Sequence, residues 1–181
     1  MDHAKAKEAL LTVRRMEFIN AKPSQQIRMA IDDLKAVRRN PNVKFDMAHW
    51  VKQKEEGSCF VCVAGAVMTQ RFDALNYIQT ALKPEMSPSS FLGQTIIKEL
   101  PYRATLKLTN SLVALNHVRT GCLSQAAVSW ELDAPAQEVI RKYGSEDDHP
   151  TLSTSWFRWL WFGRAMTELE KRANIFELAG A

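Results

Sequence analysis

Proline and glycine residues divide this chain into segments of helical length, and this punctuation restricts what the chain can fold into. Within most segments the apolar residues recur every three or four positions, the spacing that gives a helix one buried face. No segment alternates apolar and polar residues for more than about five positions, and no Asn-Gly or Asp-Gly hairpin dipeptide occurs. We therefore expect an all-α fold, a single compact domain of about eight or nine helices.

The segment that starts at Pro23 shows the helical spacing most clearly. Ile27, Ile31 and Leu34 recur at positions i, i+4 and i+7, which places them on one face of a helix. Ser24 is expected to cap the start of this helix, and the Asn-Pro pair that follows the last turn is expected to end it. Further helices are expected within residues 2–19, 57–68, 73–84, 86–101, 102–119, 122–133, 134–144 and 153–178.

Two segments of the N-terminal third are expected to differ in structure, one a helix and the other an irregular connection. Residues 2–19 place four apolar residues on one side, as is typical of an amphipathic helix: Ala6, Ala9, Leu10 and Val13. Residues 42–56 are polar and irregular, so we expect a connection there, anchored by Phe45 and Trp50.

Length and composition favour one soluble domain that spans residues 1–181. The apolar fraction of 46% and the charged fraction of 24% are ordinary for a globular protein. The longest apolar run, Phe60 to Met68, is far shorter than the roughly 18 to 20 residues that span a bilayer. The N-terminus has no apolar signal segment, and three cysteines fit reduced thiols better than a disulfide framework. We expect a cytoplasmic protein without membrane contact.

Cys59 and Cys62 lie three positions apart in the segment GSCFVCVAGAVM, which raises the question of a metal or redox site. A structural zinc ion needs four ligands, and the remaining candidates, His49, His117 and Cys122, are scattered along the chain. If Ser58 caps a helix, Cys59 lies in its first turn, where the helix dipole lowers a thiol pKa. A thioredoxin-like site, however, needs a strand before the motif, and none is expected here.

The small residues of this segment favour a structural role. Ala64, Gly65 and Ala66 allow another helix to approach closely, and free cysteine is among the most buried residue types. We interpret the segment as a tightly packed core helix, and we expect no cofactor and no bound metal.

The segment SWFRWLWFGRAMTELEKRANIF is expected to form the last helix. At about 100° per residue, one side collects Trp159, Phe162, Ala165, Met166, Leu169, Ala173 and Phe176, a full core stripe. Trp156, Phe157, Leu160 and Trp161 lie outside this stripe, on the side that carries Arg164. Aromatic residues beside arginine are typical of protein interfaces, so these five residues are our candidate interface with a partner or a second copy; cover by the chain itself and base stacking remain alternatives.

Charge is distributed unevenly along the chain. Residues 1–54 carry twelve Lys and Arg against six Asp and Glu, a net +6, whereas residues 55–181 carry twelve against fourteen, a net −2. Arg28, Lys35 and Arg39 form a basic stripe along one edge of the second helix. Such a stripe can meet an acidic partner or nucleic acid, but it is most often simply solvated.

The surroundings of the cysteine pair form a longer pattern. It consists of Trp50, Gly57, Cys59, Val61, Cys62 and the run from Ala64 to Met68. It resembles a motif of small uncharacterised proteins of tailed bacteriophages, a Trp followed by a short polar gap and Cys-x-Val-Cys-x-Ala-Gly-x-Val-Met. The resemblance extends loosely to residues 115–121, and it implies an accessory phage protein that acts in the host cytoplasm by binding a host factor.

Familiar catalytic motifs are missing from the sequence. It contains no Gly-x-Gly-x-x-Gly, no Walker loop, no Gly-x-Ser-x-Gly and no His-Glu-x-x-His. We therefore expect a non-enzymatic protein that acts by protein binding, as in host-factor or defence modulation, and by self-association. The alternatives are a thiol- or zinc-dependent enzyme centred on the Cys-x-x-Cys segment, and a nucleic-acid-binding protein that uses the basic N-terminal third.

Overall fold

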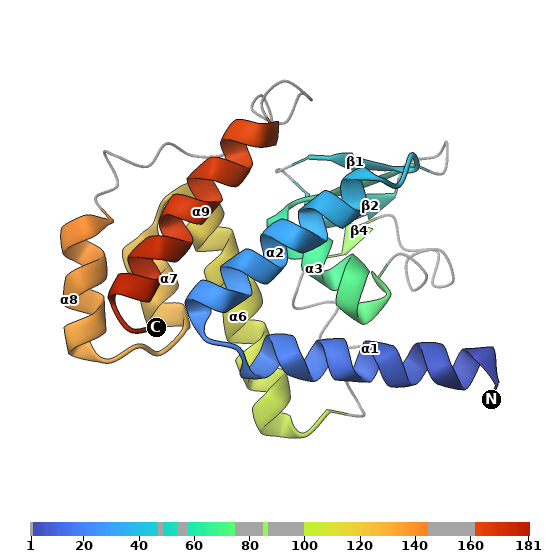
Figure 1. Cartoon of the computed structure of the whole chain (residues 1–181), viewed down its shortest axis with the longest axis horizontal. Coiled ribbons are helices and arrows are strands. Elements are labelled where there is room, and N and C mark those ends of the chain that lie inside the picture. The colour runs from blue at the N-terminus through green and yellow to red at the C-terminus, as the bar shows by residue number, and fades with distance from the viewer. Residues whose placement is uncertain (1, 47–48, 54–57, 75–84, 87–99, 145–161) are drawn as a thin grey trace.

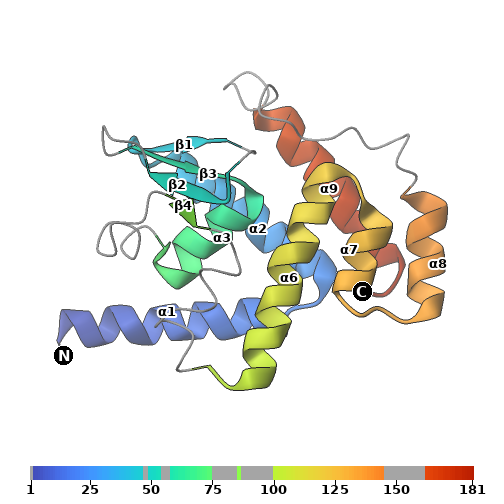
Figure 2. The same cartoon turned by 180° about the vertical axis from the view of Figure 1, so that it is seen from behind.

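A computed structural model describes residues 2–46, 49–53, 58–74, 85–86, 100–144 and 162–181 of the chain (Figure 1). Within these ranges the chain is predominantly helical, as expected, with a small sheet at one end (Figures 1 and 2). The helices are α1 (His3–Asn20), α2 (Pro23–Arg38), α3 (Val63–Phe72), α6 (Tyr102–Thr120), α7 (Leu123–Ser129), α8 (Ala134–Tyr143) and α9 (Phe162–Leu178). No described helix is both long and apolar enough to cross a membrane.

The expectation of an all-α fold is therefore correct only in its coarser form, because a small sheet accompanies the helices. Two of the expected helices, within residues 73–84 and 86–101, lie almost entirely outside the described residues. The described residues contain seven helices and a sheet with the strand order β1-β3-β2-β4. The strands are β1 (Val43–Phe45), β2 (Val51–Gln53), β3 (Cys59–Val61) and β4 (Glu85–Met86). β1 runs parallel to β3, whereas β2 is antiparallel to both β3 and β4. Each strand has two or three residues, too few for an alternating pattern to show.

The segment around the cysteines is a strand followed by a helix, not one core helix. Cys59 lies in β3, where it pairs with Val43 of β1 and Gln53 of β2. The chain leaves the strand at Cys62, which is the N-cap of α3. β-Branched and aromatic residues favour a strand over residues 59–61, and the small residues that follow make the first turn of the helix.

The second helix starts earlier than its expected cap. Lys22 is the N-cap, and Pro23 occupies the first turn, where the missing N–H of proline does not matter. Ser24 is buried inside the helix instead, and its hydroxyl donates a hydrogen bond of 2.6 Å to the backbone oxygen of Ala181. At its other end α2 stops at Arg38, before the Asn-Pro pair, as the sequence predicts.

α2 is the central helix, and its most extensive contacts are with α9 and α3. In Figure 1 it lies between α9 on one side and α1 with α3 on the other. The members of the predicted core stripe that the structure describes are buried in α9, including Phe162, Leu169 and Phe176; Trp159 lies outside the described residues. Gly121 adopts the left-handed conformation (φ +88°) that ends α6, as its place after the helix predicts.

Helix α1 lies apart from this arrangement. Its C-terminal half packs beside α3 and α6, while its N-terminal turns extend beyond the end of α3 in both views of the molecule (Figures 1 and 2).

Candidate protein-binding surface

The two cysteines of the motif are buried structural residues. Cys59 and Cys62 are each 2% exposed, and the sulfur of Cys62 accepts a hydrogen bond of 3.5 Å from the backbone N–H of Gly65. Burial raises the pKa of both thiols above the ordinary value. For Cys62 the N–H groups of the helix start and the charge of Arg119 act in the opposite direction, but burial is the largest influence. Because the thiolate is the reactive form, this environment argues against a nucleophilic or redox role.

Close packing explains why the segment is rich in small residues. A Cβ atom on Gly65 would lie 1.6 Å from the carbonyl oxygen of Trp50, which is the same oxygen that accepts a hydrogen bond from the N–H of Cys62 at 3.3 Å. The close neighbour is therefore the backbone just before β2, and not another helix. The residues from Trp50 to Gly65 are thus explained by one close packing contact between the sheet and α3.

The other metal candidates lie at separate places. His49 precedes β2, with its Nε2 atom 3.9 Å from a carboxylate oxygen of Asp46. His117 lies in the last turn of α6, where burial lowers its pKa, and Cys122 is the partly buried N-cap of α7. Within the described ranges, no three His, Cys, Asp or Glu side chains come close enough together to hold a metal ion.

The predicted basic stripe on α2 is in contact with acidic residues. Arg28 forms ion pairs with Glu177 at 2.5 Å and with Glu170 at 3.5 Å, and so connects α2 to α9. Lys35 lies 3.5 Å from Asp32 of its own helix, and Arg39 is exposed at the C-cap. Much of the charge of this stripe is therefore compensated within the chain.

The predicted aromatic interface lies mostly outside the described residues. Trp156, Phe157, Leu160 and Trp161 belong to residues 145–161. Arg164, its fifth member, is exposed in the first turn of α9.

A buried group of charged residues attaches α1 to the body of the protein. Arg71 of α3 binds both carboxylate oxygens of Asp33 in α2, at 2.6 and 3.1 Å. From α1, Arg15 donates a hydrogen bond of 3.0 Å to the carbonyl oxygen of Arg71, and the carbonyl of Arg14 accepts one from the Arg71 guanidinium at 3.3 Å. Burial raises the pKa of Asp33 to about 6, although Arg71 acts to lower it. The position of α1 thus depends on specific polar contacts as well as on apolar packing.

The side of α1 that the sequence marks as apolar faces outward. We call Ala6, Ala9, Leu10 and Val13 the outer stripe. Leu10 is 52% exposed and Val13 is 54% exposed, whereas the buried residues of the helix are Leu11, Arg15, Phe18 and Ile19. The sequence shows the spacing of the outer stripe, but the apolar row that packs on the body is harder to recognise because Arg15 interrupts it.

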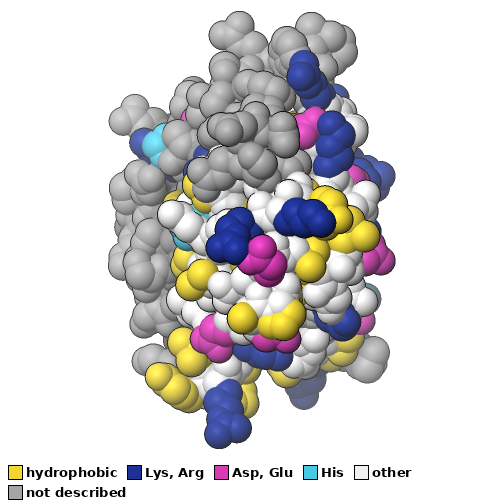
Figure 3. Space-filling model, turned by 90° about the vertical axis from the view of Figure 1, so that its left-hand side faces the viewer, with side chains coloured by type: hydrophobic (Ala, Val, Ile, Leu, Met, Phe, Trp, Pro, Cys, Tyr) yellow, Lys and Arg dark blue, Asp and Glu magenta, His cyan; other side chains and the backbone are white. Residues whose placement is uncertain are grey.

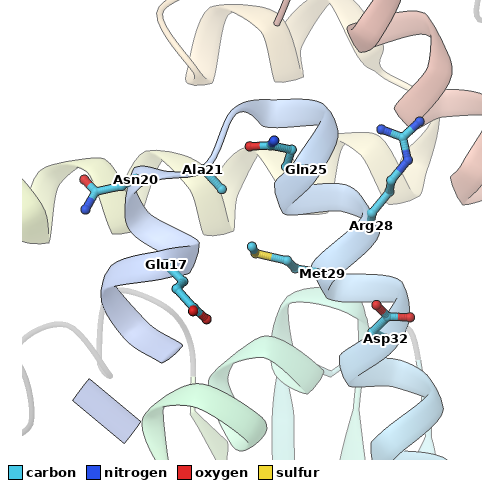
Figure 4. A pocket seen from close by; sticks show the side chains of 7 residues that line it. All are labelled: Glu17, Asn20, Ala21, Gln25, Arg28, Met29 and Asp32. Carbon is cyan, nitrogen blue, oxygen red and sulfur yellow. The ribbon is translucent and has the colours of Figure 1, made fainter. Parts of the chain in front are cut away.

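A groove continues the outer stripe toward the C-terminal end of α1 (Figure 4). It has a volume of about 490 Å³ and lies between α1 and α2. We call it the acidic groove; its lining residues are Glu17, Asn20, Ala21, Gln25, Arg28, Met29 and Asp32. In Figure 4 the side chains of Glu17 and Met29 enter the space between the two helices, whereas Arg28 extends away toward α9. Arg28 is paired with carboxylates of α9, and Asp32 lies 3.5 Å from Lys35 of its own helix, so Glu17 contributes most to the charge of the groove.

Other surfaces also expose apolar side chains, among them Tyr102 and Leu106 of α6. The face seen in Figure 3 shows hydrophobic side chains in small groups scattered among charged ones. A second cavity of about 290 Å³ lies beside Trp130, but the polar side chains next to it bind each other. The indole N–H of Trp130 donates to Gln26 at 2.7 Å, and Asn110 donates to Glu131 at 2.9 Å.

Comparison with known proteins gives no further guide to this surface. No family model, no curated protein and no solved structure matches the chain.

Proposed function

We propose that this protein acts by binding other protein chains and not by catalysis. The observation that carries the proposal is the outer stripe of α1, in which Leu10 and Val13 are more than half exposed although the helix packs on the body through another row, Leu11, Phe18 and Ile19. An apolar row on an exposed helix face is the usual anchor by which a helix binds a groove or another helix.

The surroundings of the stripe fit the composition of a protein interface. Apolar residues lie at the centre, and charged residues lie at its two ends, with Lys5 and Lys7 near the N-terminus of α1 and Glu17 near its C-terminus. This arrangement of an apolar centre with a polar rim is typical of transient interfaces.

The aromatic residues Trp156, Phe157, Leu160 and Trp161, with Arg164, remain a second proposed contact surface on the strength of their sequence. The resemblance of residues 50–68 to tailed-phage proteins supports a role as an accessory factor in the cytoplasm of a bacterial host. A host factor, or a component of host defence, is then the class of partner.

The structure gives less support to the two alternative functions. Both motif cysteines are buried as thiols of raised pKa, which does not suit a thiol-dependent enzyme. Arg28 and Lys35 are paired with carboxylates, which weakens the attraction of this stripe for phosphate groups.

Photo-cross-linking at a single position tests the proposal. A photoreactive amino acid replaces Val13 in the full chain, and a matched variant carries it in place of Val128, which is 61% exposed on α7. In a bacterial lysate we expect position 13 to give a discrete protein adduct that wild-type chain in excess suppresses. Equal adduct patterns at the two positions, or no adduct at position 13, would contradict the proposed function.

A further inference from the structure

We propose that the cavity beside Trp130 binds a free α-amino acid with an apolar side chain. This site is separate from the outer stripe of α1, and the proposed protein-binding function does not use it. Three features carry the inference: a wall that hydrogen bonds hold in place, an apolar lining, and two opposite charges in the same cavity.

The cavity lies where four segments of the chain meet. The link between α1 and α2 and the end of α7 both lie beside α6 and enclose it (Figure 2). Its volume of about 290 Å³ is at the lower end of the range of small-molecule sites, which limits the occupant to a small metabolite. The lining residues that matter for the chemistry are Ile19, Lys107, Asn110, Trp130, Glu131 and Leu132.

Hydrogen bonds hold the aromatic wall of the cavity in place. The indole N–H of Trp130 donates to the side-chain oxygen of Gln26 at 2.7 Å, and the side-chain nitrogen of Gln26 donates to the carbonyl of Phe18 at 2.8 Å. The indole also packs edge to face on Phe176, with ring centroids 5.0 Å apart. The ring is therefore positioned before a ligand arrives, which lowers the entropic cost of binding.

The apolar part of the lining suits an apolar side chain. Trp130 and Leu132 pack against the core but are only partly buried, so apolar surface of both remains open to the cavity. Ile19 and Pro23 contribute further apolar surface to the lining. An aliphatic or aromatic side chain that enters here removes its own surface and part of this lining from water, which favours binding.

Two opposite charges line the same cavity and are close along α6. Lys107 and Asn110 are three positions apart on this helix, so their side chains are neighbours. Asn110 donates a hydrogen bond of 2.9 Å to the carboxylate of Glu131. Among the described residues, no ion pair joins the ammonium group of Lys107 to a carboxylate, that of Glu131 included.

A zwitterion satisfies both of these charges. The carboxylate of a free amino acid can bind the ammonium group of Lys107, and its ammonium group can bind Glu131, whose carboxylate has acceptor sites beyond the one that Asn110 uses. A simple anion would leave Glu131 without a cation, and a simple cation would do the same to Lys107. Lys22, the third charged residue of the lining, donates to the carbonyl of Gly180 at 2.9 Å.

The backbone at Glu131 supports a role for its carboxylate. Its φ of +55° lies in the left-handed region, which glycine adopts more readily than glutamate. The turn ends α7 through backbone hydrogen bonds alone, from the N–H of Glu131 to Val128 and from that of Leu132 to Ala127. Glycine would close this helix end at a lower conformational cost, so the turn itself does not account for the glutamate.

NMR titration of the ¹⁵N-labelled full chain tests the inference. Trp130→Phe identifies the indole N–H signal of Trp130, which reports on the cavity wall. We expect L-phenylalanine or L-leucine to shift this signal saturably, with a dissociation constant of about 0.1 to 1 mM. Phenethylamine, which lacks the carboxylate, and 3-phenylpropionate, which lacks the ammonium group, should each bind at least about fivefold more weakly than phenylalanine.

Two outcomes of this titration would overturn the inference. One is the absence of a saturable shift with either amino acid up to about 20 mM, well above the expected dissociation constant. The other is equal binding of phenylalanine and the two analogues, because the opposite charges would then have no part in recognition.

Two variants test the charges one at a time. Lys107→Met keeps most of the apolar stem and should weaken phenylalanine binding at least about fivefold without changing the binding of phenethylamine. Glu131→Gln, which can still accept from Asn110, should do the same without changing the binding of 3-phenylpropionate. Lys5→Met, an exposed change at the far end of α1, is the control and should leave all affinities unchanged. Equal effects of Lys107→Met and Lys5→Met would overturn the inference.

The two proposals can fail separately. A discrete adduct at position 13 without amino-acid binding would overturn this inference and leave the proposed function standing. Amino-acid binding that requires Lys107 and Glu131, without an adduct at position 13, would support this inference and contradict the proposed function.

Discussion

Gly65 stands where the first turn of α3 meets the carbonyl of Trp50, and no other residue fits there without movement of the backbone. A Cβ atom at this position would lie 1.6 Å from that oxygen, much closer than van der Waals contact allows. We expect Gly65→Ala to lower the free energy of unfolding by at least about 3 kcal/mol.

Gly163 provides the matched control for this change. It lies in the first turns of α9, and a Cβ atom there would meet no atom within 4 Å. Gly163→Ala is expected to be neutral or to stabilise the protein by up to about 1 kcal/mol, because alanine is the better helix former. Urea unfolding of both variants measures the difference. Similar stabilities for the two variants would contradict the packing that the structure shows.

The three cysteines should differ in their reactivity. Cys59 and Cys62 are buried and have raised pKa values, whereas Cys122 is partly exposed. In the native protein we expect an alkylating reagent to label Cys122 first, and the other two only at the rate of unfolding. Peptide mapping by mass spectrometry identifies the labelled thiol. Fast labelling of Cys59 or Cys62 in the folded chain would revive the thiol-enzyme hypothesis.

Asp33 makes the stability of the protein depend on pH in a definite direction. Burial raises its pKa in the folded chain to about 6 from an ordinary value of 3.8. Between these values the folded chain holds a proton that the unfolded chain has lost, so the contribution of Asp33 to stability decreases as pH rises from about 4 to 6. Above about pH 6 the carboxylate is charged, and the guanidinium of Arg71 then compensates this buried negative charge.

The variant Asp33→Asn isolates this contribution, because all other groups titrate alike in both proteins. We expect the free energy of unfolding of wild type minus that of the variant to fall as pH rises from 4 to 7. Chemical denaturation at four or five pH values measures it. A difference that rises over this range would show that Arg71, and not burial, determines the pKa.

At the scale of single elements, the helices were the predictable part of the fold. α2, α6 and α9 carry long apolar rows of helical period, and their ends are marked by proline or glycine. These signals act locally, so they can be read without knowledge of the tertiary structure.

The small sheet could not be predicted for a physical reason. β1 and β3 have three residues each and pair across more than a dozen positions of sequence, so their stability comes from pairing and not from a local pattern. The same applies to the outer stripe. Its apolar spacing is plain in the sequence, but which side of α1 is buried depends on Arg15, whose contacts with Arg71 and Glu8 are made only in the folded chain.

Arg172 connects α9 to α6 through hydrogen bonds that no sequence pattern predicts. It is fully buried in α9 and donates hydrogen bonds to the backbone carbonyls of Val118 and Arg119 at the end of α6. A cation at this end of a helix is favourable because the carbonyls carry partial negative charge. Burial lowers the pKa of Arg172 to about 10, so the side chain remains charged at neutral pH.

Removing this contact should destabilise the junction of α6 and α9. Arg172→Met leaves the two carbonyls without their donor, and we expect a loss of about 1 to 3 kcal/mol in the free energy of unfolding. Arg103→Met, a change of the same kind at an exposed position of α6, is the control and should change stability little. Thermal unfolding followed by circular dichroism compares them. Equal melting temperatures would contradict the structural role of Arg172.

At the scale of the whole molecule, α9 and the C-terminal residues that follow it are held against α2 by polar contacts. Arg28 binds Glu177, the ammonium group of Lys22 donates to the carbonyl of Gly180 at 2.9 Å, and Ser24 binds Ala181. Between the described residues, the N-terminal turns of α1 make fewer such contacts, among them the ion pair of Lys7 with Asp73 at 3.3 Å. The last helix is thus held against α2 by polar contacts at several points, while the surface that we propose for a partner lies on the first helix.

Hydrogen–deuterium exchange of the full chain, alone and together with the protein captured at position 13, tests most directly whether α1 is the contact surface. In the chain alone we expect the amides of its N-terminal turns to exchange fast, because few tertiary contacts protect them. The captured protein should slow exchange across α1 from His3 to Glu17 and leave α8 unchanged. Protection confined to other elements, or exchange in α1 that the captured protein does not change, would contradict the account.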